Sequence, residues 1–366
     1  MFKANTSHLQ QEFFSAVNQL SKDKKAKLMA SAQWQFYQLI FCQIDESLFA
    51  PLYSEKGSRP NAPVNAMVSA LILKHHFGWT FQELFEQMDF NLLTRAALGL
   101  NDLDTTPFAS STLFDFQHRL FEYDLQTGEN LFECVFDQLT AQQLARLKLK
   151  TSIQRTDSVM IASNIRDFSR LQLLIEVLLR LHRILSEADQ AELDELLAPY
   201  LKHGSGSKYA YRLKRDTLPD ELSRLGHIYQ HLAQFCQASY AETEIFRIFQ
   251  RVYTEHFTVA NETVSVIPAK ELSGSIIQSP DDPEATYRTK GDTASKGYVV
   301  NAVETAHPDN DVNLLVDVAV EPNSTDDAAL LHSRLDGLKE KTPELNEVHG
   351  DGGFGSEDND KKCTEL

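Results

Sequence analysis

The sequence predicts an α+β protein, in which an all-helical N-terminal domain is followed by an α/β domain that a second helical block interrupts. Three observations predict this fold class. Apolar residues recur at helical spacing through most of residues 1–140 and again through residues 165–258. Residues 148–163 alternate with a period of two, which is typical of a strand. Residues 280–366 contain strand-like runs rich in β-branched residues around one helical stretch.

These changes of period divide the chain into four segments. We expect a helical N-terminal domain, a first strand region, a helical insertion and the remainder of the second domain at residues 1–145, 146–164, 165–260 and 261–366. A chain of 366 residues can bury one large core or two to three smaller ones. Its 42% of apolar and 24% of charged residues are typical of a globular protein.

The sequence indicates neither a signal peptide nor a membrane span. Its first residues mix polar and aromatic side chains, and its most apolar stretch, Leu171–Leu185, is shorter than the roughly 20 residues that a membrane span needs. We interpret that stretch as a buried core helix. The four cysteines are scattered without a Cys-x-x-Cys pair, which argues against a structural zinc site and a disulfide framework. We therefore expect a cytoplasmic protein.

The N-terminal domain contains clear helix boundaries. Residues 65–77 place apolar side chains at helical spacing, and Gly78 then breaks the pattern. Thr80 and Glu83 form a capping-box pattern, in which each side chain satisfies a free backbone N–H at a helix start. A further helix is predicted from Ser110. A helix, a glycine turn and a capped helix are compatible with a DNA-binding helix-turn-helix, although most such pairs are only packing units.

The helical insertion holds the densest basic cluster of the chain. A Gly-Ser-Gly-Ser stretch at residues 204–207 predicts a loop, and Tyr209 and Tyr211 follow it. The flanking cations are Lys202, Lys208, Arg212, Lys214 and Arg215. Two interpretations stay open. The cluster is either a solvated loop or a surface on which Lys and Arg replace counterions along a nucleic-acid backbone.

The last part of the chain predicts a strand hairpin, a helix and a short strand. Residues 297–305 and 312–320 are the two strands of the hairpin. Residues 324–327 cap a helix that has leucines on one stripe. Residues 345–350 then form a short strand that leads into Asp351.

Two aspartates are predicted at the ends of strands. Asp157 follows the alternating run of the first strand region, and Asp351 follows the last short strand and precedes a glycine-rich stretch. Carboxylate oxygens are ligands of hard divalent cations, so the pair is a candidate metal site for phosphodiester chemistry. Taken singly, Asp157 is more often a polar strand-end residue, and Asp351 is more often a residue of an Asp-Gly turn.

Five stretches spread over most of residues 55–360 resemble one known family. They read RPNAPVNAMVSALILKHHFGWTFQELFEQM, SSTLFDFQHRL, RTDSVMIASNI, SPDDPEATYRTKGDTASKGYVVNAVET and VHGDGGFGSEDN. In this order they resemble a bacterial insertion-sequence transposase of the DDE class. The order of strands, insertion and aspartates also matches a ribonuclease-H-like catalytic domain, whose first acidic residue lies on the first strand and whose second lies just after the fourth.

The resemblance implies a function for each of these parts. Asp157 and Asp351 would bind two Mg²⁺ or Mn²⁺ ions, typically about 3.5–4 Å apart. One ion would activate a water or a DNA 3′-hydroxyl, and the other would stabilise the leaving oxygen. The N-terminal helices and the basic cluster would hold the terminal inverted repeat. The partners would be transposon ends, target DNA and further copies of the chain, because such enzymes usually act as multimers on paired ends.

The sequence departs from the family in the third acidic residue, a glutamate on a helix after one further strand. Only 15 residues follow Asp351, and Glu357 and Glu365 lie in the wrong topological place. We therefore expect a chain that is truncated at its C-terminus and inactive in strand cleavage by itself. The net charge is −17, and residues 261–366 hold 22 acidic against 9 basic residues, which gives no support for DNA binding.

Two alternatives to a truncated transposase stay open. The first is a non-enzymatic DNA-binding remnant that occupies transposon ends or inhibits an intact transposase. The second is an unrelated Mg²⁺-dependent phosphohydrolase that uses the same two aspartates. Selective binding to terminal inverted repeats over random DNA, at fixed salt, separates the phosphohydrolase from the other two.

Overall fold

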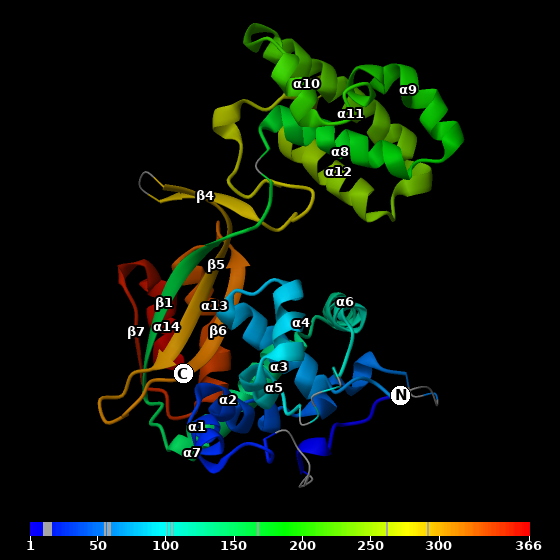
Figure 1. Ribbon diagram of the computed structural model, residues 1–366. Coiled ribbons are helices and arrows are strands. Elements are labelled where there is room, and N and C mark those ends of the chain that lie inside the picture. Colours follow the sequence, from blue (N-terminus) through cyan, green and yellow to red (C-terminus); the bar gives the residue numbers. More distant parts are fainter. Residues whose placement is uncertain are drawn as a thin grey trace. The chain divides into compact units, whose positions relative to one another are not determined.

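The computed structural model divides the chain into two compact units (Figure 1). The first unit comprises residues 1–150 and 308–316, and the second comprises residues 151–307 and 317–366. The structure describes residues 1–9, 17–54, 56, 60–100, 102, 104, 106–166, 168–260, 263–290 and 293–366, without the side chains of Arg215 and Lys290.

The first unit is helical, as predicted for residues 1–140. Its α-helices are α1 (Lys22–Met29), α2 (Ala32–Leu39), α3 (Val64–Phe77), α4 (Phe81–Phe90), α5 (Leu92–Ala97), α6 (Ser110–Thr127) and α7 (Leu131–Leu147). Their shared core includes the large side chains of Phe49, Met67, Leu84 and Phe116. Residues 64–71 of α3 are all buried, so α3 is the central helix of this unit.

The predicted boundary between α3 and α4 is confirmed. Gly78 ends α3 in the left-handed region with a φ of 69°, which glycine adopts without the steric cost of a Cβ. Thr80 Oγ1 accepts a hydrogen bond from the Glu83 N–H at 3.2 Å, and a Glu83 carboxylate oxygen accepts one from the Thr80 N–H at 2.8 Å. The capping box read from the sequence is therefore present at the start of α4.

A five-stranded mixed sheet organises the second unit. Its strands are β1 (Ile153–Ala162), β4 (Thr286–Lys290), β5 (Thr293–Thr305), β6 (Leu315–Pro322) and β7 (Glu347–His349). Strands β1 and β5 pair antiparallel from Gln154–Thr305 to Ala162–Gly297. Strand β7 pairs parallel with β1, whereas β4 and β6 both pair with β5. The strand that carries Asp157 therefore has a neighbour on each side.

Several predicted strand positions are corrected by the structure. Asp157 does not end its strand but lies near the middle of β1, because the pairing with β5 continues to Ala162. Strand β5 begins before residue 297, at Thr293, where β4 pairs with it. Strand β6 spans Leu315–Pro322 and is displaced toward the C-terminus from the predicted residues 312–320.

Helix α13 (Asp327–Lys341) covers one face of the sheet. Leu330 of this helix packs with Val299 of β5 and Ala319 of β6 in one buried cluster. Asp326 caps the helix, since its carboxylate accepts a hydrogen bond from the Ala328 N–H at 2.9 Å, which confirms the predicted cap within residues 324–327. Figure 1 shows α13 alongside β6, with the short helix α14 (Glu357–Glu365) next to it.

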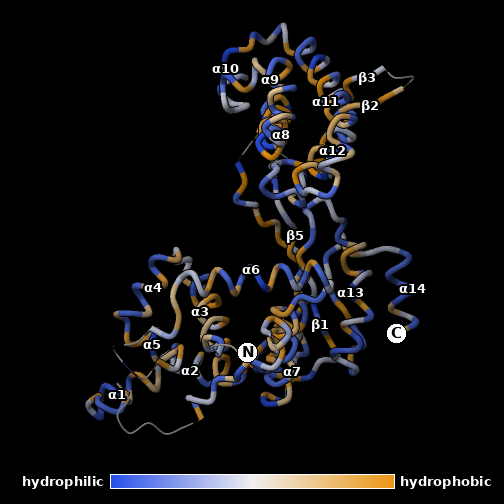
Figure 2. The backbone as a smooth tube through the Cα atoms, turned by 90° about the vertical axis from the view of Figure 1, so that its right-hand side faces the viewer, coloured by the Kyte–Doolittle hydropathy of each residue, from blue (hydrophilic) through white to orange (hydrophobic). Residues whose placement is uncertain are grey.

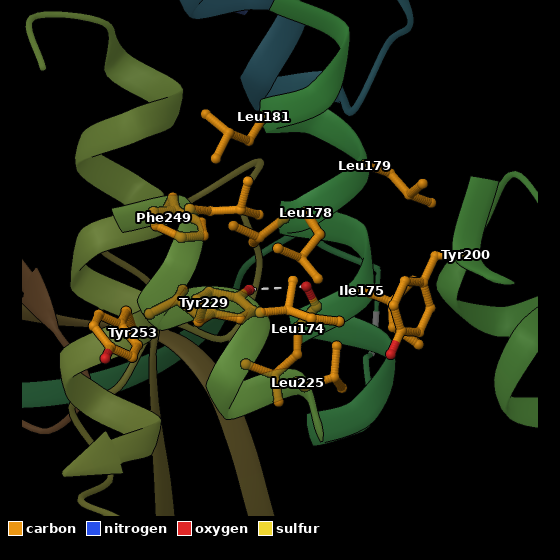
Figure 3. Close-up of a cluster of buried hydrophobic side chains, with 14 of the residues drawn as sticks. Leu174, Ile175, Leu178, Leu179, Leu181, Tyr200, Leu225, Tyr229, Phe249 and Tyr253 are labelled. Carbon is orange, nitrogen blue, oxygen red and sulfur yellow. Dashed lines mark hydrogen bonds between the residues drawn. The ribbon is translucent and has the colours of Figure 1, made fainter. Parts of the chain in front are cut away.

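Between β1 and β4, the chain forms a helical insertion with a core of its own. Its helices are α8 (Arg170–Ile184), α9 (Glu187–Leu201), α10 (Gly206–Arg212), α11 (Leu218–Tyr240) and α12 (Glu244–His256). The stretch predicted as a core helix is α8, and it is buried along most of its length. Figure 2 shows hydrophobic and hydrophilic residues alternating along α8. Figure 3 shows leucines of α8 packed against aromatic rings, where Tyr229 Oη donates a hydrogen bond to the carbonyl oxygen of Leu174 at 2.8 Å.

A small hairpin ends the insertion where the sequence predicts helix up to residue 258. Strands β2 (Phe257–Ala260) and β3 (Thr263–Val266) pair antiparallel directly after α12. The hairpin forms because Phe257 and Val264 are buried in the core of the insertion. Gly226 of α11 lies against these two side chains, since a Cβ on this glycine would meet both at 2.9 to 3.0 Å.

The two ends of the insertion meet beside the sheet. The Ser163 N–H donates a hydrogen bond to the carbonyl oxygen of Lys296 at 3.0 Å. The carboxylate of Asp282 accepts hydrogen bonds from the hydroxyls of Ser163 and Tyr298. Gly297 has a φ of 143°, and a Cβ there would lie 2.3 Å from the carbonyl oxygen of Ile161. The close approach of β1 and β5 at this end of the sheet therefore requires glycine.

Candidate functional site

Asp157 lies on the exposed side of β1. The alternation of the strand buries Gln154 and Thr156, while Arg155 and Asp157 are exposed. One carboxylate oxygen of Asp157 accepts a hydrogen bond from the Ser158 N–H at 2.8 Å. This bond holds the carboxylate close to the strand and leaves the side chain open to solvent.

A buried amide on β5 fixes the backbone at Asp157. The side chain of Asn301 is completely buried, and its Nδ2 donates hydrogen bonds to Thr156 Oγ1 at 2.8 Å and to the carbonyl oxygen of Asp157 at 3.1 Å. These bonds add a side-chain attachment to the backbone ladder between β1 and β5. The polar group thus holds the segment from the buried side, opposite the exposed carboxylate.

Asp351 lies just after β7 at the start of a short 3₁₀-helix, η6 (Gly352–Phe354). Its carboxylate caps this helix by accepting a hydrogen bond from the Gly353 N–H at 2.8 Å. Phe354 at the end of η6 is 3% exposed and anchors the turn in the core. The side chain of Asp351 is exposed, like that of Asp157.

The register of the sheet brings the two aspartates to neighbouring strands. In the parallel pairing of β1 and β7, Gln154 lies opposite Val348 and Arg155 lies opposite His349. The alignment continues past the last paired residue, because a Cβ on Gly350 would lie 3.1 Å from Thr156 Cγ2. The next residues along the two strands are Asp157 and Asp351. The pairing therefore brings the segments that carry these two residues, 194 positions apart in the sequence, alongside each other.

A further carboxylate, which the sequence analysis did not single out, lies close to that of Asp351. Asp327 begins α13, and one of its oxygens accepts a hydrogen bond from Ser158 Oγ at 2.8 Å. The position that a Cβ on Gly353 would occupy lies 3.0 Å from an oxygen of Asp351 and 3.4 Å from an oxygen of Asp327. The sequence shows Asp327 only as an acidic residue in a first helical turn, which a helix dipole favours anywhere.

The donor groups near β1 and β7 are carboxylates. Within the described ranges of the chain, no group of three or more His, Cys, Asp or Glu side chains is placed to hold a metal ion. The side chain of His349, next to the site on β7, contacts Glu347 at 3.2 Å instead. The two aspartates predicted from the sequence lie on or just after strands that pair with each other.

The basic cluster of the insertion is placed differently from the prediction. Lys208 and Arg212 lie on α10, because Ser205 caps a helix at Gly206 by accepting a hydrogen bond from the Lys208 N–H at 3.3 Å. The predicted loop at residues 204–207 is therefore half helix. Lys202 and Lys214 lie at the end of α9 and after α10, and these four side chains are exposed. The side chain of Arg215 lies outside the described residues.

Residues 24–119 match a family model described as a transposase domain (DUF772). This match supports a role in transposition. The matched segment includes α3 and α4 with their confirmed caps and ends within α6. No curated protein and no solved structure matched the chain. None of the helices in the described ranges is long and apolar enough to cross a membrane.

Proposed function

We propose that the chain is a transposase of the DDE class whose sheet is a ribonuclease-H-like catalytic domain acting on transposon ends. The match of residues 24–119 to a transposase domain supports a role in transposition and implies DNA as a partner. The observation that supports the chemical part of the proposal is the parallel pairing of β1 with β7, the strands that carry or directly precede Asp157 and Asp351.

The connections of the sheet support the assignment of its fold. Leaving aside the short strand β4, the chain runs through β1, β5, β6, α13 and β7 in that order. Strand β5 is antiparallel to β1, β6 lies on the far side of β5, and β7 returns parallel to β1. The first acidic residue then lies on the first strand and the second lies just after the fourth, as the family resemblance implies.

The two aspartates fit Mg²⁺ or Mn²⁺ by the chemistry of their donors. Each uses one carboxylate oxygen to accept a hydrogen bond from a backbone N–H within its own segment. Both side chains are exposed, so water, metal ions and a DNA phosphate can reach them. Hard divalent cations prefer oxygen ligands of this kind, and two bound ions would supply Lewis-acid activation of an attacking oxygen and stabilisation of the leaving oxygen.

Residues of the chain hold the two aspartates in place for this chemistry. Asn301 donates a hydrogen bond to the backbone carbonyl oxygen of Asp157. The carboxylate of Asp351 accepts a hydrogen bond from a backbone N–H at the N-terminus of η6. Ser158 links β1 to Asp327 at the start of α13, so the helix and the strand are tied together beside the pair. Groups fixed by supporting hydrogen bonds keep catalytic geometry better than groups on free loops.

DNA recognition is tested by equilibrium binding of the purified chain to a duplex that carries the terminal inverted repeat read from the flanking DNA. The reference is a shuffled duplex of equal length and composition, at one fixed salt concentration. We expect tighter binding to the matched end. Equal affinity for the two duplexes would contradict a role at transposon ends and would leave the phosphohydrolase alternative standing.

Metal binding is tested by titration of Mn²⁺ into the wild-type chain and into Asp157→Asn and Asp351→Asn, followed by electron paramagnetic resonance. We expect each substitution to weaken Mn²⁺ binding by at least about ten-fold, because each removes a charged oxygen donor. Asp358→Asn is the matched control, since Asp358 is an exposed aspartate on α14 that is not one of the two proposed ligands. Mn²⁺ binding that is unchanged in both variants would overturn the assignment of the metal site.

Cleavage is measured separately, with Mg²⁺ and the matched end. Strand cleavage that both aspartate substitutions abolish supports the enzyme. Selective binding of the matched end without cleavage, under conditions in which Mn²⁺ binds, fits both a transposase that lacks its third acidic residue and the non-enzymatic DNA-binding alternative.

A further inference from the structure

Helix α10 is held firmly on its inner side. A Cβ on Gly206 would lie 2.4 Å from the carbonyl oxygen of Gln172, so the backbones of α10 and α8 touch. Tyr209 Oη donates a hydrogen bond to a carboxylate oxygen of Glu221 at 2.8 Å, and its ring lies 5.0 Å from that of Tyr200. The position of α10 is therefore set by its contacts with the core of the insertion.

The outer side of α10 presents an aromatic ring between cations. Tyr211 is 93% exposed, in contrast to Tyr209 on the inner side. Lys208 lies one helical turn before Tyr211, and Arg212 follows it directly. Neither cation forms an ion pair with a carboxylate within the part of the chain that the structure describes. An exposed tyrosine that shields no core and lies among unneutralised cations has no evident structural role.

A further cation from outside the helix joins this side. Arg166 Nη2 donates a hydrogen bond to Ser207 Oγ at 3.0 Å, and its guanidinium lies 5.5 Å from the ring centroid of Phe168. Arg166 belongs to the segment that leaves β1, so it brings a positive charge from the sheet side of the insertion to α10. We call Arg166, Lys208, Tyr211 and Arg212 the α10 surface.

We infer that the α10 surface binds an unpaired strand of DNA, with the ring of Tyr211 stacked on a base and the three cations on the flanking phosphates. The inference rests on the proposed function, which supplies DNA as the partner. Cations beside an exposed aromatic ring are the combination that binds single strands, because phosphates and base faces are both available there. In a duplex the base faces are covered by their neighbours, so the ring could stack only where pairing is lost.

Rigid mounting favours this function. A ring on a helix that is fixed by Gly206 and Tyr209 loses little conformational freedom when a base stacks on it. The α10 surface is also connected to the candidate site along the chain. Asp157 lies on β1, and Arg166 follows four residues after the end of this strand.

The test compares two DNA substrates in fluorescence anisotropy, at the same salt, with the full chain. One is a blunt duplex of the matched end, and the other is that duplex with an unpaired extension on one strand. We expect Tyr211→Ala to weaken binding of the extended substrate by about five-fold or more and to change binding of the blunt duplex by less than about two-fold. Tyr211→Phe retains the ring, so we expect it to bind like the wild type.

Substitution of the cations should have a different signature. Lys208→Ala and Arg212→Ala should weaken binding of the extended substrate and lower the slope of log affinity against log salt by roughly one for each lost phosphate contact. Because Tyr211 is exposed, Tyr211→Ala should leave the thermal unfolding temperature unchanged. That measurement excludes misfolding as the cause of weaker binding.

The outcomes separate the inference from the proposed function. If the wild type binds both substrates and Tyr211→Ala binds both equally well, the inference is wrong and the proposed function stands. If Tyr211→Ala weakens both substrates to the same extent, stacking on an unpaired base is also excluded. If the wild type binds neither substrate better than shuffled DNA, the proposed function fails and the inference fails with it.

Discussion

His256 should make the stability of the chain depend on pH in mildly acidic solution. The side chain ends α12, is 1% exposed and has no hydrogen-bond partner for either ring nitrogen among the described residues. Burial, with a smaller contribution from the nearby guanidinium of Arg170, lowers the pKa of His256 from 6.5 to about 4. Arg170 Nη2 donates a hydrogen bond to the carbonyl oxygen of His256 at 2.7 Å, so this cation cannot move away.

The magnitude follows from the difference between the two pKa values. Above pH 6.5 the ring is neutral in the folded and the unfolded chain, and His256 adds no pH dependence. Between pH 6.5 and about 4 the unfolded chain binds a proton that the folded chain does not, so the free energy of unfolding falls as the pH falls. At about 1.4 kcal/mol per pH unit the full loss is roughly 3 kcal/mol, of which roughly 2 kcal/mol is reached near pH 5.

The assay is urea unfolding at a series of pH values, followed by circular dichroism, for the wild type and for His256→Phe and His256→Leu. Both apolar replacements remove the titrating group and two unsatisfied buried nitrogens, so their stability near pH 7 should equal or exceed that of the wild type. The difference in unfolding free energy between variant and wild type should grow by roughly 2 kcal/mol from pH 7 to pH 5. Carboxylates that titrate in the same range cancel in this difference. A difference that stays constant with pH would refute the reasoning.

Three further predictions concern the first unit, the sheet and the candidate site. Gly350→Ala should destabilise the chain by about 1–3 kcal/mol in urea unfolding, because its Cβ would meet Phe354 at 2.9 Å; the open Gly337 on α13, replaced in the same way, should show no such loss. Asp317→Asn should cost about 3 kcal/mol, since Asp317 is 1% exposed and accepts hydrogen bonds from Arg334 and Lys341. Burial raises the pKa of Asp317, but these two cations outweigh burial and lower it below its usual range. The stability that Asp317 contributes to the wild type should therefore be lost as the pH falls through the acidic range. An Asp317→Asn variant whose stability depends on acid pH as much as that of the wild type would contradict this. Thr80→Ala should lower the stability of the first unit in thermal unfolding by about 1 kcal/mol, because it removes the capping hydroxyl. Thr80→Ser keeps a hydroxyl and should retain most of this stability. Equal losses of stability in the two variants would count against a capping role.

Local sequence signals predicted the elements whose ends depend on neighbouring residues. Gly78, the Thr80–Glu83 box and the acidic cap of α13 act within one helical turn, and the structure contains each of them. The apolar run that became α8 is long enough for its spacing to indicate a buried helix. These features depend on contacts between residues that are close in the sequence.

Elements that depend on distant partners were predicted less well. Strand β4 forms against the first half of β5, and the β2–β3 hairpin forms because Phe257 and Val264 enter a core built by α8, α11 and α12. Neither run has a strong alternation of its own. The position of Asp157 within its strand was missed for the same reason, because the length of β1 is set by its pairing with residues 297–305.

In the candidate site too, the sequence predicted single residues from local patterns but not their distant neighbours. Asp157 and Asp351 were found because each follows a strand-like run, but the parallel pairing that brings their segments alongside each other is not revealed by any local pattern. Asp327 was missed because its place beside Gly353 arises only when α13 packs on the sheet. The contrast between Tyr209 and Tyr211 likewise depends on which side of α10 meets the core.

The hydrogen bond between Ser163, just after β1, and Lys296 of β5 has a consequence for how the sheet can assemble. Strands β1 and β5 are separated by roughly 130 residues, and closing a flexible loop of that length costs on the order of 4 kcal/mol in chain entropy. The insertion has a core of its own, and it joins its two ends through Asp282. Once it has formed, the two strands are joined as closely as the arms of a short hairpin. We therefore expect the insertion to form before the sheet, and we expect substitutions in its leucine and tyrosine core to slow the pairing of β1 with β5.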